Sequence, residues 1–213
     1  MRKNRGVVMP NWCTTTYAFT GEPDALKRFR IDLQNYTSKN YHENGFGETW
    51  LGNVLAGYDL YPSEGQDCFS YRGNIAEIDW RNGVLYVTTH TAWSPTTEMW
   101  DAILNKHFQD EYGDNLIDYV FISEEPRTEV YVNTDTDGTI FPERFLLEVG
   151  DIPEHRDYES YYLESEQEVI DLINEIFTIR IETWGELKEF LEDRELDVDG
   201  TLSLHEYDVR WRE

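Results

Sequence analysis

Hydrophobic periodicity in the N-terminal part of the chain predicts a strand followed by a helix. Residues 12–20, WCTTTYAFT, predict a strand, and apolar residues recur three and four apart over 26–36, the period of a helix. Residues 38–70 are rich in Asn, Gly, Glu and Ser and predict a long loop, with a short helical turn over 50–60. A loop of this length is uncommon and is a candidate for function.

The middle of the chain carries a hairpin signal and a second helical pattern. Two strand-like segments, 70–80 and 84–93, flank Asn82-Gly83, the dipeptide typical of a tight two-residue turn. Ser94-Pro95 predicts the start of a helix, and residues 115–122 predict a fourth strand. The order strand, helix, strand, strand, helix, strand is typical of an α+β, ferredoxin-like βαββαβ fold with an antiparallel sheet in strand order 4-1-3-2.

The C-terminal part of the chain predicts an added β-hairpin and then helices. Strand-like segments on either side of Asn133–Gly138 predict the hairpin, and capping-box signatures that begin at Ser165 and Thr183 each precede an apolar helical face. The composition between hairpin and helices becomes acidic and Tyr-rich. We therefore expect a ferredoxin-like domain over 9–150 and an acidic, mainly helical extension over 151–213.

Composition indicates a folded, acidic protein of a reducing compartment. Of the 213 residues 39% are apolar, too many for a disordered chain, and no run of apolar residues is long enough to span a membrane. The two cysteines, Cys13 and Cys68, lie roughly 9–10 Å apart in the predicted strand order, which is too far for a disulfide, so we expect free thiols. Two cysteines are also too few for a disulfide framework, which favours a reducing, cytoplasmic location. The formal charge of −25, from 43 acidic and 18 basic residues, argues against direct binding to nucleic acid or to an anionic membrane.

One edge of the predicted sheet, where the first strand starts, collects residues that are distant in the sequence. They are Asn11, Trp12, Cys13, Tyr71, Arg72, His90, Trp93, Glu124 and Glu125. Convergent Cys, His, Arg and carboxylate side chains suit nucleophilic or acid–base chemistry, which makes Cys13, His90, Arg72 and Glu124 the candidate catalytic residues. The alternative is a buried, inert Cys13, a sheet histidine at position 90, and an ion pair of Arg72 with Glu124 or Glu125.

Several short segments resemble one protein family. They are Met9-Pro10-Asn11-Trp12-Cys13, Trp50-Leu51-Gly52, Tyr71-Arg72-Gly73-Asn74-Ile75, Thr91-Ala92-Trp93-Ser94-Pro95 and Glu124-Glu125. Together they are similar to the YubB ferredoxin-like family of plasmid, phage and other mobile-element proteins, over residues 9–147. Tyr71 stands where the family pattern has a cysteine, so no cysteine role transfers to it. The resemblance implies the fold and a mobile-element setting, and it makes Met9 an alternative start, with residues 1–8 a disordered extension or translated leader.

Residues 195–206 match part of the EF-hand calcium loop. The candidate ligands are Glu195, Asp197, Asp199, Thr201, Ser203 and Glu206, with Gly200 at the sharp turn. The first position is Glu rather than Asp, the exit helix would have at most seven residues, and no second hand is present. The alternative is a β-turn at Asp199-Gly200 between two strands. Calcium is the one cofactor that the sequence raises.

We expect a binding protein rather than an enzyme. The acidic surface predicts a protein partner with a basic surface, in particular a partner whose nucleic-acid-binding face it occupies. The first alternative is an enzyme with a small site at the strand-start edge that uses Cys13, His90 and Glu124. The second is a calcium-binding module formed by residues 195–206.

Overall fold

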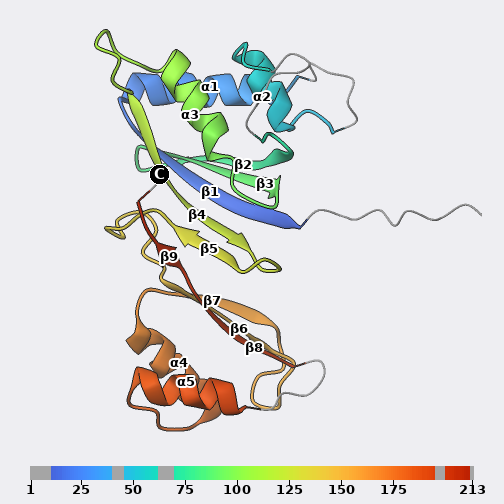
Figure 1. The fold of residues 1–213 in the computed structure, drawn as a ribbon, viewed down its shortest axis with the longest axis vertical. Coiled ribbons are helices and arrows are strands. Elements are labelled where there is room, and N and C mark those ends of the chain that lie inside the picture. Colours follow the sequence, from blue (N-terminus) through green and yellow to red (C-terminus); the bar gives the residue numbers. More distant parts are fainter. Residues whose placement is uncertain (1–10, 40–45, 62–69, 195–199, 212–213) are drawn as a thin grey trace, which may run out of the picture. The chain divides into compact units, whose positions relative to one another are not determined.

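The protein is an α+β chain that divides into two compact units. A computed structural model describes residues 11–39, 46–61, 70–194 and 200–211, and these contain five helices and nine strands. Contacts within the chain divide it into residues 1–130 and residues 131–213, and each unit is considered by itself (Figure 1). The division falls within residues 128–132, the first strand of the predicted hairpin.

The first unit contains four strands and three helices. They are β1 (Trp12–Gly21), α1 (Pro23–Tyr36), α2 (Leu51–Gly57), β2 (Gly73–Arg81), β3 (Val84–Ala92), α3 (Thr97–His107) and β4 (Ile117–Glu125). The strands are hydrogen-bonded in the order β2-β3-β1-β4, and all neighbours run antiparallel. The turn between β2 and β3 has positive φ at both Asn82 (53°) and Gly83 (82°), as the Asn-Gly signal predicts.

Helices α1 and α3 cover one face of this sheet (Figure 1). Alternate residues of β1 point into the core, and the ring of Phe19 lies 5.0 Å from that of Phe29 on α1 and 5.5 Å from that of Trp100 on α3. Tyr17 is fully buried and its ring lies 5.6 Å from Trp100. Residues between them in the sequence, such as Thr14, point to the opposite face.

Helix α3 begins two residues later than Ser94-Pro95 predicts. The carbonyl of Ser94 accepts a hydrogen bond from the Thr91 hydroxyl at 2.7 Å, which holds the chain in a turn after β3. The backbone amide of Thr96 donates to the buried Tyr17 hydroxyl at 2.9 Å, and Thr96 is the N-cap. The tertiary bond to Tyr17 therefore decides where the helix starts.

The second unit contains a three-stranded antiparallel sheet and two helices. Its elements are β5 (Val130–Asn133), whose first residue is the last of the first unit, and β6 (Phe145–Gly150), β7 (Glu159–Leu163), α4 (Glu166–Phe177), α5 (Trp184–Asp193), β8 (Thr201–Glu206) and β9 (Asp208–Val209). The sheet has the order β7-β6-β8, and β5 pairs with β9 in parallel. One core cluster joins β6 to α4 and α5 through Leu147, Ile173 and Leu187.

The added hairpin is a wrong prediction, because β5 and β6 belong to different sheets. The buried Asn133 amide donates to the carbonyls of Phe141 and Glu143, both at 2.9 Å, and the Asp135 carboxylate accepts from the Phe141 amide at 2.8 Å. The Arg144 guanidinium donates to the Phe141 carbonyl at 2.9 Å. These side chains close a loop on itself, so the segment does not fold back as a strand pair.

The prediction of a mainly helical extension needs correction, because β7 and β8 flank β6 on either side. The Tyr-rich segment that forms β7 and the alternating segment that forms β8 are both short. Their conformation depends on pairing with β6, a contact that local periodicity does not reveal.

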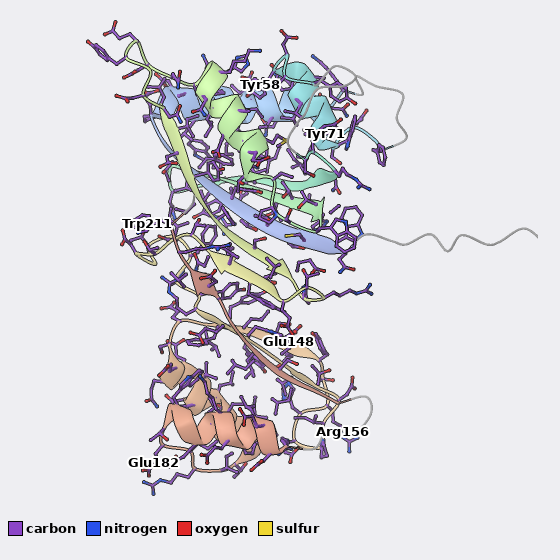
Figure 2. The ribbon with its side chains drawn as sticks, viewed as in Figure 1. Tyr58, Tyr71, Glu148, Arg156, Glu182 and Trp211 are labelled. Atoms are coloured by element: carbon purple, nitrogen blue, oxygen red, sulfur yellow. The ribbon has the colours of Figure 1, made fainter. Side chains whose placement is uncertain are left out.

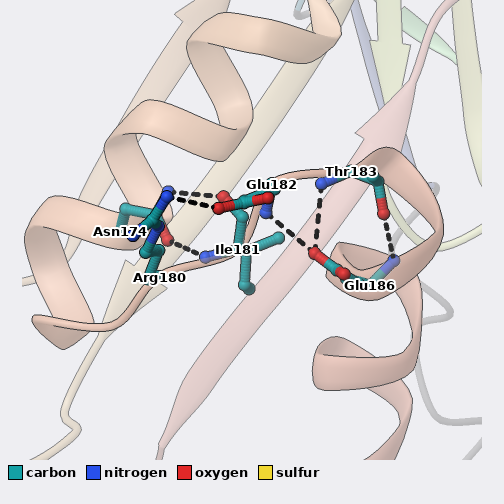
Figure 3. A network of polar contacts seen from close by, with 6 residues as sticks. All are labelled: Asn174, Arg180, Ile181, Glu182, Thr183 and Glu186. Carbon is teal, nitrogen blue, oxygen red and sulfur yellow. Dashed lines mark hydrogen bonds and ion pairs between the residues drawn. The ribbon is translucent and has the colours of Figure 1, made fainter.

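The two helices of this unit form as the capping signatures predict. The Thr183 hydroxyl accepts from the Glu186 amide at 3.3 Å, and the Glu186 carboxylate accepts from the Thr183 amide at 3.2 Å (Figure 3). Asn174 binds both backbone groups of Ile181, at 2.9 and 2.7 Å, and so ties the end of α4 to the segment before α5. At α4 the Ser165 hydroxyl accepts from the third helical amide at 3.3 Å.

No helix in the described part of the chain is long and apolar enough to cross a membrane.

Candidate functional site

The strand-start edge brings the predicted residues to one end of the first sheet but divides them between its two faces. Cys13 lies opposite Thr91, whereas Thr14 lies opposite both His90 and Glu124. Because side chains alternate along a strand, Cys13 points to the helices while His90 and Glu124 point to the other face. The structure therefore does not pair Cys13 with His90.

Cys13 is a fully buried thiol within a small polar cluster. Its Sγ lies 3.0 Å from the Ser123 hydroxyl and 3.6 Å from the Thr15 hydroxyl, and these two hydroxyls lie 2.8 Å apart. Burial raises the pKa of the thiol, an effect that the hydrogen bonds only partly oppose. A protonated, enclosed thiol is a poor nucleophile. Cys13 forms no disulfide, and Cys68 lies outside the described residues.

The predicted ion pair between Arg72 and a carboxylate at the end of β4 is not formed. Glu125 is buried, and its carboxylate instead accepts from the amide and the hydroxyl of Thr128, which closes the turn after β4. Arg72 is exposed, and its side chain makes no hydrogen bond or ion pair with any residue that the structure describes. Its guanidinium is therefore available to another group.

A cleft of about 380 Å³ opens beside Arg72. It is lined by Trp12, Phe46, Trp50, Arg72, Gly73, Asn74 and Ala92. Trp12 lies opposite Ala92 and Asn74 lies opposite His90, so these residues occupy the face that points away from the helices. We call this hollow the edge cleft.

Phe46 and Trp50 reach the edge cleft from the segment before α2. The carbonyl of Thr49 accepts from the amide of Ile75 at 2.9 Å, and Trp50 forms a bridge with Asn74, so this segment extends the β2 edge. The Trp50 ring lies against Gly52, where an added Cβ would come within 2.5 Å of it. Gly52 therefore leaves the space that the Trp50 ring occupies.

An aromatic cluster supports the floor of the edge cleft. The Trp50 ring lies 5.5 Å from Phe46 and 5.7 Å from Tyr71, which is marked beside α2 in Figure 2. Gly73 allows the backbones to approach closely, because a Cβ there would lie 2.3 Å from the His90 carbonyl oxygen. The sequence places Trp12 and Arg72 at this edge, but it gives no signal for Phe46 and assigns no chemistry to Asn74, which it raises only within the family-like segment Tyr71–Ile75.

Acidic side chains are concentrated in the second unit. Residues 131–213 contain 24 acidic and seven basic residues, a formal charge of −17, whereas residues 1–130 contain 19 acidic and 11 basic residues, a charge of −8. Each helix of this unit carries three exposed carboxylates at positions i, i+3 and i+7. These carboxylate stripes are Glu168, Asp171 and Glu175 on α4, and Glu186, Glu189 and Asp193 on α5.

The predicted calcium ligands fall partly outside the described residues. Glu195, Asp197 and Asp199 lie there, whereas Thr201, Ser203 and Glu206 lie in β8, where an EF-hand would continue into its exit helix. In the part of the chain that the structure describes, no three His, Cys, Asp or Glu residues are grouped so as to hold a metal ion.

Comparison with protein-family models, with curated proteins and with solved structures finds no match to this chain.

Proposed function

We propose that the protein is a non-enzymatic binding protein whose acidic second unit, residues 131–213, engages a basic surface of a protein partner. The observation that carries this proposal is the pair of carboxylate stripes on α4 and α5. Long-range attraction between such stripes and Lys- or Arg-rich surfaces accelerates association and selects partners by charge.

Repulsion between the carboxylates of each stripe opposes the stability of the helix that carries it, although Glu186 also stabilises α5 through its capping box. Like charges three and four residues apart destabilise a helix by roughly 0.2–0.5 kcal/mol per pair. In the part of α5 that forms the stripe, the structure shows no Lys or Arg paired with Glu189 or Asp193. A partner that places cations against the stripe removes this repulsion, so the proposed binding also stabilises the unit.

The proposed partner is a protein with a nucleic-acid-binding face. Such a face presents Lys and Arg side chains toward the negatively charged phosphates of nucleic acid. A row of carboxylates is also negatively charged and can therefore bind to the same face. This hypothesis makes a specific prediction, because duplex DNA should then compete with the protein for its partner.

Charge reversal with a matched control tests the proposal. The variant Glu189→Lys, Asp193→Lys reverses two carboxylates of the α5 stripe and leaves the capping residue Glu186 in place. The control Glu77→Lys, Glu111→Lys makes the same change of charge in the first unit. We expect the immobilised wild type and control to capture a basic protein from host lysate, and the stripe variant to lose it.

The captured protein should be released between about 50 and 200 mM salt, and by duplex DNA at constant salt. Capture that resists both salt and DNA, or that the stripe variant retains, would contradict the proposal. Thermal melting of each variant followed by circular dichroism checks that the fold is intact.

We propose further that the first unit is a ferredoxin-like domain of the YubB mobile-element type, acting in the cytoplasm. The strand order β2-β3-β1-β4 and the helix-covered face support the fold assignment. The protonated, buried Cys13 favours a binding role over a thiol enzyme.

A further inference from the structure

We propose that the edge cleft binds a small ligand made of a planar heteroaromatic ring and one anionic group, the chemical class of a nucleoside monophosphate. The cleft belongs to the first unit, and this inference is independent of the acidic stripes of the second. It rests on three features of the cleft: exposed aromatic rings, an unpaired guanidinium and a rigid frame.

The aromatic walls of the edge cleft are open to solvent. Trp12 is 51% exposed and Phe46 is 69% exposed, whereas Trp50 beneath them is 8% exposed. Large aromatic side chains left open beside a buried one form a platform on which a flat ring can stack. A base placed there would cover the exposed apolar surface of these rings.

Arg72 supplies a cation at the same place. Three other arginines of the first unit have polar partners: Arg28 donates to the His107 carbonyl, Arg81 lies 2.9 Å from Asp79, and Arg127 lies 3.4 Å from the Asn11 amide oxygen. Arg30 lies 5.9 Å from the centre of the Trp80 ring, and its Nε is buried without a hydrogen-bond partner. Arg72 has none among the described residues, although the chain has more than twice as many acidic as basic residues. A guanidinium binds a phosphate through two parallel hydrogen bonds.

Asn74 adds a donor and an acceptor to the lining of the cleft. Its side-chain amide makes no hydrogen bond with any described residue, and Asn74 lies two residues after Arg72 and forms the bridge with Trp50. An amide of this kind can bond to the edge of a base, which carries both donors and acceptors.

The backbone around the edge cleft is held by hydrogen bonds between distant segments. The amide of Ala92 donates to the Arg72 carbonyl at 2.9 Å, and the amide of Trp93 donates to the Asn11 carbonyl at 3.0 Å. Gly73 packs closely against β3, where an added Cβ would lie 2.3 Å from the His90 carbonyl oxygen. A cleft that is already formed binds a ligand with little loss of conformational entropy.

Size and charge favour a free mononucleotide over a polymer. A volume of about 380 Å³ lies at the lower end of the range for small-molecule pockets, roughly 300–1,000 Å³. The formal charge of −25 repels the additional phosphates of a longer strand. The 5′-terminal nucleotide of a nucleic acid carries the same ring and phosphate as a free mononucleotide. The experiment therefore compares free mononucleotides with a 5′-phosphorylated oligonucleotide.

Isothermal titration calorimetry of the full chain with AMP, GMP, CMP and UMP, with the four nucleosides, and with a 5′-phosphorylated hexanucleotide tests the proposal. We expect at least one monophosphate to bind and its nucleoside to bind at least about tenfold more weakly. The variant Arg72→Gln should bind the monophosphate at least about tenfold more weakly than the wild type. The control Arg81→Gln, at the other end of β2, should bind it as the wild type does. Trp12→Ser should weaken binding, and Trp211→Ser, an exposed tryptophan of the second unit, should not.

Three results would overturn the assignment: no heat with any monophosphate at millimolar concentration, equal affinity for nucleoside and monophosphate, or unchanged binding in Arg72→Gln. Tighter binding of the hexanucleotide than of the monophosphate would overturn the choice of a free nucleotide. The variant with a reversed α5 stripe should bind the monophosphate as the wild type does, which separates this test from that of the proposed partner surface.

Discussion

The variant Tyr17→Phe removes one oxygen atom from the core of the first unit. Its hydroxyl accepts the hydrogen bond of the Thr96 amide at 2.9 Å, at the N-cap of α3. The ring contacts with Trp100, Tyr119 and Phe121, all between 5.6 and 5.7 Å, remain in the variant. The buried amide loses its partner, which costs about 1–3 kcal/mol of unfolding free energy at pH 7.

The same variant should change how stability depends on alkaline pH. Burial raises the pKa of Tyr17 to about 12 from the ordinary value of 10. The folded state therefore holds this proton more tightly than the unfolded state does. The stability that it contributes is present below pH 10 and is lost as the pH rises toward 12, by about 1.4 kcal/mol at pH 11. Phenylalanine has no such proton, so the wild type should lose most of its advantage over the variant at pH 11.

Urea unfolding at pH 7 and pH 11 measures both effects. Tryptophan fluorescence is a suitable probe because five of the seven tryptophans lie in residues 1–130. Tyr112→Phe, at a residue that is 82% exposed, is the control and should change stability little at either pH. A difference between wild type and Tyr17→Phe that is the same at both pH values would refute the reasoning.

Four further changes test individual features. Alkylation of Cys13 by iodoacetamide, located by mass spectrometry, should be slow in the native protein and fast in denaturant; rapid native labelling would contradict its enclosure. Gly73→Ala places a Cβ 2.3 Å from a carbonyl oxygen and should lower the unfolding free energy by about 1–3 kcal/mol in urea titrations. Asn133→Ala leaves two carbonyls of its loop without their donor and should cost about 2 kcal/mol in the same assay, whereas an unchanged midpoint would remove the loop network as a stabilising feature. Thr183→Ala removes the N-cap of α5 and should cost about 1 kcal/mol, with Thr183→Ser restoring most of it.

The elements that the sequence predicts well are those whose signals are local. The Asn82-Gly83 turn needs two residues that tolerate positive φ, and the Thr183 capping box needs two side chains three residues apart. Both are complete within four residues of sequence, and in this structure no distant contact displaces them.

The elements that the sequence misses are those that a distant contact decides. The start of α3 depends on the bond from Thr96 to Tyr17, 79 residues earlier, and the loop that begins at Asn133 depends on side chains that bind the backbone up to ten residues away. The edge cleft is similar, because Phe46 and Asn74 line the same cleft only when the Trp50 segment pairs with the edge of β2. Because side chains alternate between the two faces of a strand, Cys13 shares a face with Tyr17 and Phe19, and its burial follows from that placement.

The hydroxyl groups buried beneath β1 bear on how this sheet finds its alignment. A slip of two residues between β1 and β4 keeps every apolar side chain on the helix-covered face, so apolar burial alone barely distinguishes the two alignments. Thr15 lies directly opposite Ser123 only in the observed pairing, and their hydroxyls meet at 2.8 Å with the Cys13 thiol beside them. A slipped strand would bury these polar groups among hydrocarbon without partners. The polar cluster of Cys13, Thr15 and Ser123 thus favours the observed register of β1 and β4 over the slipped one.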